Sequence, residues 1–200
     1  MNGALLLQGL AIGFGIAVPV GPIGLLVIQR TLAGGFRPGF LSGLGAAAAD
    51  AVYGAIGGFG VGWATALLLD WQAGFRLAGG LFLAWLAWGA FRSRPAAEAA
   101  RPARGGTFLS TFLLTIANPA TILSFAAIFG GVLPPGGSGA GAGWLVAGVA
   151  AGSILWWLIL AGGTSLARRR LPPGAMLWLN RASGLILAAF AAYALVGLAL

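Results

Sequence analysis

The chain has 200 residues, of which 60% are hydrophobic and 7% charged, and its formal net charge is +8. Soluble domains normally carry about a quarter charged residues, so the composition predicts one integral membrane domain with no room for a second, soluble one. The chain has no Cys, no His and three acidic residues, which excludes thiol chemistry and leaves almost no basis for a metal site or a Ser-His-Asp triad. We therefore expect no metal, no cofactor and no enzyme activity.

Six apolar stretches approach the roughly 20 residues that a helical membrane span needs. They cover residues 4–28, 39–65, 75–91, 107–133, 143–167 and 176–200, and the third could begin nearer Trp71. The predicted fold class is an all-α integral membrane protein with six transmembrane helices. A single polytopic domain covers residues 1–200, with one half at 1–91, a basic cytoplasmic loop at 92–106 and a second half at 107–200.

The first stretch is interrupted by Pro19-Val20-Gly21-Pro22, about two-thirds of the way along it. Proline removes a backbone donor and clashes with the preceding turn, so we expect the helix to split here. Pro22 suits the first turn of a new half-helix, where its missing N–H costs nothing. Arg30 lies at the cytoplasmic end of this stretch, and we interpret it first as a snorkelling anchor and second as a candidate gate.

The second stretch contains Asp50, eleven residues after Gly39. At 1.5 Å per residue this is about 17 Å along a helix, near the middle of a membrane. An isolated charge there is costly, so Asp50 should be protonated, paired or facing a polar cavity. It is a candidate proton carrier or partner for a substrate ammonium, and the alternative is a structural pair with an Arg or a hydrogen bond to a neighbouring helix. Tyr53, nearly one turn later, could line the same wall.

Arginines gather in alternate loops between the apolar stretches. The first loop has Arg30 and Arg37, the third has four cations within 92–104 against one acid, and the fifth has three at 168–170. Cation-rich loops stay in the cytoplasm, so both termini should lie outside a bacterial inner membrane. This distribution also accounts for the net charge without a nucleic-acid partner.

The fourth stretch is interrupted by Ala117-Asn118-Pro119, a little under halfway along it. Asn118 is a good N-cap and Pro119 a good first-turn residue for a second half-helix. Beyond the two breaks the half-helices run in opposite directions, so their N-termini should face each other near the bilayer centre. Opposed N-termini form an anion site, for which a substrate carboxylate is the natural guest. The alternative is that these prolines only kink helices for packing.

The two halves also resemble each other weakly. Residues 76–79 align with residues 181–184, and residues 45–50 of the second stretch align with residues 148–153 of the fifth. Three spans per half is an odd number, so the second half must be inverted relative to the first, as in many secondary carriers. Gly-x-x-x-Gly spacings that begin at Gly9, Gly39, Gly54 and Gly148 indicate close helix packing and allow a homodimer without requiring one.

Three motifs in order resemble the LysE/RhtB family of amino-acid exporters over nearly the whole chain. They are Pro19-Val20-Gly21-Pro22, the Gly39-x-x-x-Gly43-x-Gly45 run that leads to Asp50-Ala51-Val52-Tyr53-Gly54, and Asn118-Pro119-Ala120-Thr121-Ile122-Leu123-Ser124-Phe125. The resemblance implies export of amino acids or related metabolites, driven by the proton gradient. It also implies a functional core of Pro19, Gly21, Pro22, Asp50, Asn118 and Pro119. Many members have Lys directly after Asn-Pro, where this chain has Ala120.

These observations together predict a secondary transporter that exports an amino acid or related small metabolite, with protons as the second partner. Substrate would bind at Pro19, Gly21, Pro22, Asn118, Pro119 and Tyr53, and Asp50 would serve the proton or the ammonium. The alternatives are a carrier for an inorganic cation or another metabolite, and a non-transport membrane subunit or scaffold. A scaffold should tolerate Asp50→Asn and Pro22→Ala.

Overall fold

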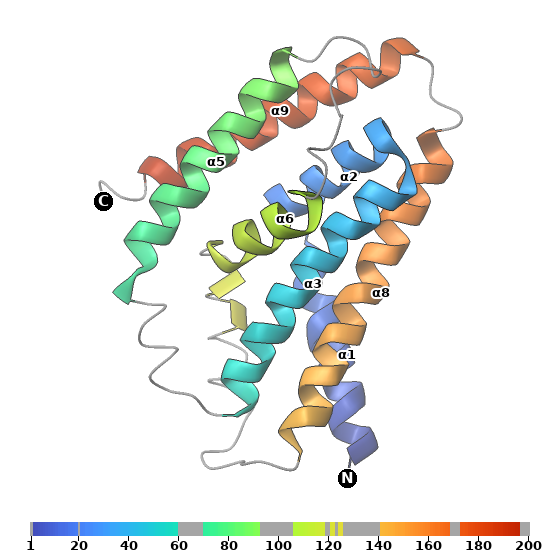
Figure 1. Cartoon of the computed structure of the whole chain (residues 1–200), viewed down its shortest axis with the longest axis vertical. Helices are drawn as coiled ribbons and strands as arrows, with labels where there is room; N and C mark the ends of the chain where they lie inside the picture. The colour runs from blue at the N-terminus through green and yellow to red at the C-terminus, as the bar shows by residue number, and fades with distance from the viewer. Residues whose placement is uncertain are drawn as a thin grey trace.

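In a computed structural model of the chain, the described residues form helices and no strands (Figure 1). The description covers residues 2–19, 21–59, 70–92, 106–118, 121–122, 124–125, 141–168 and 173–196. The helices are α1 (Asn2–Ala17), α2 (Pro22–Gly34), α3 (Phe36–Gly58), α5 (Gln72–Arg92), α6 (Gly106–Ile116), α8 (Ala142–Arg168) and α9 (Pro173–Val196). The predicted all-α class is confirmed, and α5 begins close to Trp71, before the predicted start of the third stretch.

Length and apolarity mark α3 and α8 as candidate membrane spans within the described residues. Helices α1 and α2 qualify together as a third, bent by 78° at the break between them. An apolar protein with such helices is a membrane protein, in agreement with the composition. The number six and the inverted repeat stay predictions.

The break between α1 and α2 lies at the proline motif. The last helical turn of α1 closes with the Val18 amide donating to the Phe14 carbonyl oxygen at 3.0 Å. Gly21 is extended, with φ −95° and ψ −163°, and Pro22 comes next as the first residue of α2. Leu25 then donates to the Gly21 carbonyl oxygen at 3.1 Å, which starts the new helix. The chain changes direction where proline prevents a continuous helix.

A second break comes after α6. The Asn118 amide donates to the Thr115 carbonyl oxygen at 3.1 Å, three residues back, so the last turn of α6 tightens. Helical bonding then resumes one turn later, because the Ile122 amide donates to the Asn118 carbonyl oxygen at 3.1 Å. The predicted interruption at Asn118 is confirmed, and Pro119 and Ala120 lie outside the described residues.

Glycines bring α1 and α8 into backbone contact. A Cβ at Gly13 would lie 2.0 Å from the Val149 carbonyl oxygen, and one at Gly152 would lie 2.1 Å from the Leu10 carbonyl oxygen. No side chain fits at such distances, so the two Gly-x-x-x-Gly spacings of α1 and α8 serve each other inside one chain. The close packing that the spacings indicated is confirmed, and the homodimer stays untested.

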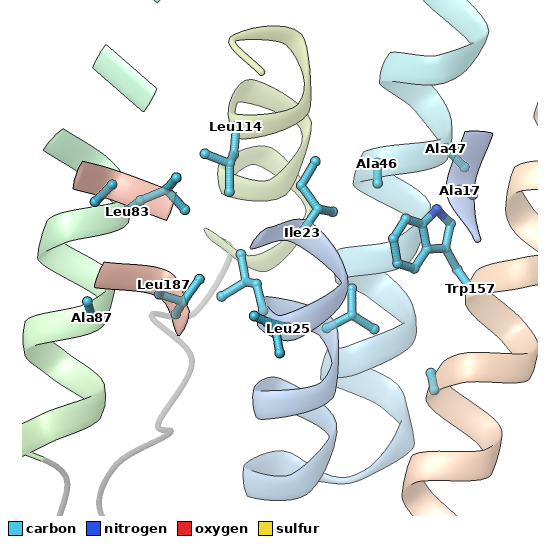
Figure 2. Close-up of a cluster of buried hydrophobic side chains, with 14 residues drawn as sticks. Ala17, Ile23, Leu25, Ala46, Ala47, Leu83, Ala87, Leu114, Trp157 and Leu187 are labelled. Atoms are coloured by element: carbon cyan, nitrogen blue, oxygen red, sulfur yellow. The ribbon is translucent and has the colours of Figure 1, made fainter. Parts of the chain in front are cut away.

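Helices α5 and α9 lie side by side and pack against the rest of the molecule through α2 (Figure 1). Figure 2 shows α2 between this pair and helices α3 and α8, with Ile23 and Leu25 of α2 in the middle of a buried apolar cluster. Leu83 and Leu187 reach the cluster from α5 and α9, and Trp157 reaches it from α8. The half-helix after the first break is therefore at the centre of the core.

Candidate functional site

Asp50 lies in the interior, on the face of α3 that meets α8. Its side chain is 3% exposed, and the Ser153 hydroxyl of α8 donates to its Oδ2 atom at 2.6 Å. The Trp157 indole, one turn further along α8, donates to the Ser153 Oγ atom at 3.0 Å. A hydrogen bond to a neighbouring helix was the structural alternative that the sequence left open for Asp50, and the structure has this bond. The hydrogen bonds run from Trp157 to Ser153 and from Ser153 to the Asp50 carboxyl.

Tyr53 connects the same face of α3 to the second break. Its side chain is 3% exposed, and its hydroxyl donates to the Ile116 carbonyl oxygen at 2.5 Å. Ile116 is the last residue of α6, where carbonyl groups lose their intrahelical partners. The ring also stacks on Phe125, beyond the break, with centroids 5.4 Å apart. Tyr53 therefore contacts the chain on both sides of Asn118.

One apolar cluster joins the end of α1 to the break after α6. Tyr53, Ile122, Phe125 and Val149 form its buried part, and side chains from the second half of α1, from α3 and from the end of α6 pack against it. Those outer members are Ile12, Ile16, Ile56 and Ile116. The structure thus places the end of α1, just before the first break, beside the second break, although Pro22 and Pro119 are 97 residues apart in the sequence.

At the first break, Gly21 is the N-cap residue of α2 and has no side chain with which to cap the helix. The amide groups of its first turn have no partner within the helix, and the dipole places partial positive charge at this end. Pro19 is exposed, and Gly21 and Pro22 are half-buried. Asn118 is half-buried at the other break, and Pro119 cannot be placed because it is outside the described residues.

Arg30 turns into the protein and does not extend away from it as the expected snorkelling anchor would. From α2, its Nη1 atom donates to Ser42 of α3 at 2.8 Å and to Thr111 of α6 at 2.7 Å. The same atom reaches the Thr107 carbonyl oxygen at 2.9 Å, and Nη2 donates to Ser110 at 2.8 Å. These hydroxyls donate to carbonyl oxygens of their own helices, so each turns its oxygen toward the guanidinium. Arg30 ties α2 to α3 and α6.

Sequence reasoning missed the partners of these side chains. Ser153 and Trp157 carry no motif, although residues 148–153 align with residues 45–50 and so pair Ser153 with Asp50. The hydroxyls around Arg30 lie in apolar stretches, where Ser and Thr commonly bond to their own helix backbone. As for a metal, the described residues hold no group of three carboxylate, His or Cys side chains.

The motifs, the two broken helices and the buried acid agree with a comparison against known families. The family model of the LysE type translocators matches residues 14–197. This chain belongs to that family. It is 31% identical over 173 residues to the Escherichia coli (strain K12) protein YahN, named an uncharacterized membrane protein, and the match covers 83% of this chain and 78% of YahN. No solved structure matches. The translocator is thus a membrane transporter, and the predicted family is confirmed.

Proposed function

We propose that this translocator exports an amino acid or a related small metabolite from the bacterial cytoplasm in exchange for protons. The observation that carries the proposal is the position of Asp50, a buried carboxyl within one turn of Tyr53, which itself contacts the break after α6. Intramembrane acids are costly and commonly belong to proton relays or substrate pathways. Broken helices commonly form the substrate and coupling-ion sites of secondary carriers.

Helix pairing supports two inverted halves. Exchanging the halves would replace the first span (α1 with α2) by the fourth, which begins with α6, and would replace α3 by α8 and α5 by α9. The contact of α1 with α8 then becomes the contact of α6 with α3, and both contacts exist. The exchange leaves the contact of α3 with α8 and the contact of α5 with α9 unchanged, and both exist as well. This set of contacts is unchanged by the exchange, as a two-fold relation requires.

The substrate in this proposal is an amino acid held at both ends. Its carboxylate binds at the N-terminus of α2, near Gly21 and Pro22, and at the N-terminus expected after Asn118 and Pro119. Its ammonium or the exchanged proton binds at Asp50, and Tyr53 lines the same wall. Arg30 acts as a gate on the cytoplasmic side, because it joins α2 of the first half to α6 of the second. Both termini then lie outside the inner membrane.

Efflux from proteoliposomes tests this proposal. Proteoliposomes are loaded with a panel of radiolabelled amino acids, and a pH gradient is imposed. They contain wild-type protein, Asp50→Asn or the control Asp70→Asn, which makes the same chemical change at an exposed position. We expect gradient-driven movement of at least one amino acid, lost in Asp50→Asn and kept in Asp70→Asn.

Three other outcomes are informative. Movement that survives Asp50→Asn keeps the carrier and removes Asp50 from proton coupling. No movement of any amino acid by the wild type overturns the amino-acid substrate and directs the same assay to inorganic cations. A protein that moves no solute, and whose thermal unfolding no solute shifts, would be the non-transport subunit or scaffold.

A further inference from the structure

The contacts between helices are of two kinds. Helix α1 touches α8 backbone to backbone, and α3 touches α6 in the same way, because a Cβ at Gly45 would lie 2.2 Å from the Phe108 carbonyl oxygen. Helix α3 meets α8 through side chains instead. Gly43 faces the Trp157 side chain, and a Cβ at Gly54 would lie 3.3 Å from a methyl group of Val149. The boundary between α3 and α8 therefore separates two pairs of closely packed helices, α1–α8 and α3–α6.

Asp50 and Ser153 lie at this boundary and occupy equivalent places in the two halves. They are the last residues of the aligned segments 45–50 and 148–153, and they are in direct contact at 2.6 Å. Equivalent residues of two halves related by a two-fold axis can touch each other only beside that axis. The pair is therefore at the centre of the predicted repeat, with a carboxyl on one side and a hydroxyl on the other.

A serine hydroxyl can serve both protonation states of its partner, because it is a donor and an acceptor. With Asp50 ionised, Ser153 donates to Oδ2, and its 2.6 Å bond falls in the range of about 2.5–2.7 Å for a hydroxyl on a carboxylate. When a proton from solution adds to Oδ2, the new acid O–H donates to the Ser153 oxygen. The serine hydrogen then turns to the carbonyl oxygen of Val149, four residues back. No proton leaves the serine.

Two features of the chain fit this exchange. The backbone bond proposed for Ser153 is the one that Thr31, Thr111 and Thr115 make to the carbonyl oxygen four residues back, at 2.7–2.9 Å. The Trp157 indole can only donate, and it donates to the Ser153 oxygen, which holds that oxygen in place in either state.

We propose that Ser153 is a positioning residue that makes the contact between the α1–α8 and α3–α6 pairs depend on the proton at Asp50. This inference rests on the proposed proton-coupled function. A hydrogen bond to a carboxylate is roughly twice as strong as a neutral one, so the ionised pair holds α3 on α8 and protonation weakens that hold. Proton binding and helix movement are thereby linked at one hydrogen bond.

Few other charges face Asp50. On its own helix, Tyr53 is engaged with Ile116. On α2, Arg30 is engaged with α3 and α6. The sequence of α6 has no ionisable side chain, and the sequence of α8 has only Arg168 at its end, which donates to the Ala33 carbonyl oxygen at 3.1 Å. We therefore assign a pH-dependent change in the contact between α3 and α8 to protonation of Asp50.

A matched pair of variants tests the role of the hydroxyl. Ser153→Thr keeps it and adds a methyl group, and Ser153→Val has the same shape without it, so both variants carry the same steric cost. We expect gradient-driven efflux to be close to wild type with Thr and to fall about tenfold with Val, as for the loss of a hydrogen bond to a charged group. Substrate exchange without a gradient, which needs no proton, should fall less than twofold.

Equal gradient-driven efflux by Ser153→Thr and Ser153→Val overturns the proposal. So does a Ser153→Val protein in which gradient-driven efflux and gradient-free exchange fall by the same factor. Should the added methyl group prevent folding in both variants, Ser153→Ala removes the hydroxyl without overpacking. It should reproduce the result expected for Val, and wild-type efflux by Ser153→Ala overturns the proposal.

A second measurement needs no substrate and so separates this proposal from the proposed function. The chain has no Cys, so Ala47→Cys places a single thiol on α3 at a position that is 2% exposed. Its labelling is measured against pH and normalised to denatured protein at each pH. We expect labelling to rise severalfold at acidic pH with Ser or Thr at position 153, and to be fast at every pH with Val. A pH response that is the same with Val as with Ser overturns the proposal, whether or not an amino acid is transported.

Discussion

Toward α1, helix α8 presents Gly148 and Gly152, and the two backbones touch. Toward α3, the same helix presents Ser153 and Trp157, and the contact is a hydrogen-bonded chain that ends on a buried carboxyl. A backbone contact at glycines depends on close approach, so a shift of either helix loses packing. A hydroxyl that can donate or accept a hydrogen bond gives the contact two possible arrangements. One helix thus has one face suited to a fixed contact and another suited to a contact that changes with a proton.

A methyl group added at the α1–α8 contact should cost much more stability than one added at the α3–α8 contact, and this is the largest effect that we expect. Gly13→Ala forces a Cβ against the Val149 carbonyl oxygen, which can be relieved only by separating α1 from α8. We expect it to cost about 3 kcal/mol of unfolding free energy, the upper end of typical overpacking. Gly54→Ala meets only a side-chain methyl group and should cost less than about 1 kcal/mol. Thermal unfolding in detergent measures both.

Gly15→Ala is the control for this prediction, because a Cβ there meets nothing within 4 Å. It should leave the protein as stable as wild type or slightly more stable, since Ala favours helix over Gly by about 1 kcal/mol. Equal stability of Gly13→Ala and Gly15→Ala would contradict the backbone contact.

Arg30→Lys should break the hydrogen bonds that join α2 to the α3–α6 pair. A lysine keeps the charge, but its compact ammonium cannot reach the four acceptors that the guanidinium holds. We expect a loss of about 2 kcal/mol, the range of a hydrogen bond to a charged group, together with a leak of substrate in the absence of a pH gradient. Arg37→Lys, at an exposed position, is the control. A tight, fully stable Arg30→Lys protein would remove the gate from the account.

Tyr53→Phe should have the smallest of the three effects. It deletes the hydroxyl that bonds to the Ile116 carbonyl oxygen and keeps the ring stacked on Phe125. The expected loss is about 1 kcal/mol of stability, the net value of one hydrogen bond, with weaker substrate affinity. Tyr193→Phe, 77% exposed, should change neither. Wild-type unfolding and substrate binding by Tyr53→Phe would show that Tyr53 does not hold the α6 break.

The sequence predicted the features that depend on local chemistry. Proline cannot continue a helix, so the interruptions at Pro22 and Asn118 were readable from a few residues. Asp50 was readable as well, since a lone acid in an apolar stretch should be protonated, paired or facing a polar cavity. The partners were not readable, because Ser153 reaches Asp50 only through the packing of α3 on α8. Likewise the direction of Arg30 depends on hydroxyls that lie 12 to 81 residues away in the chain.

The central claim is that one buried carboxyl takes the proton that is exchanged for substrate. Purified protein in weak buffer with a pH indicator tests it directly, once a transported amino acid is identified. If substrate and proton compete at Asp50, adding that amino acid should release up to about one proton per site from wild type, and the release should be absent in Asp50→Asn. Equal proton release from wild type and Asp50→Asn would contradict the account.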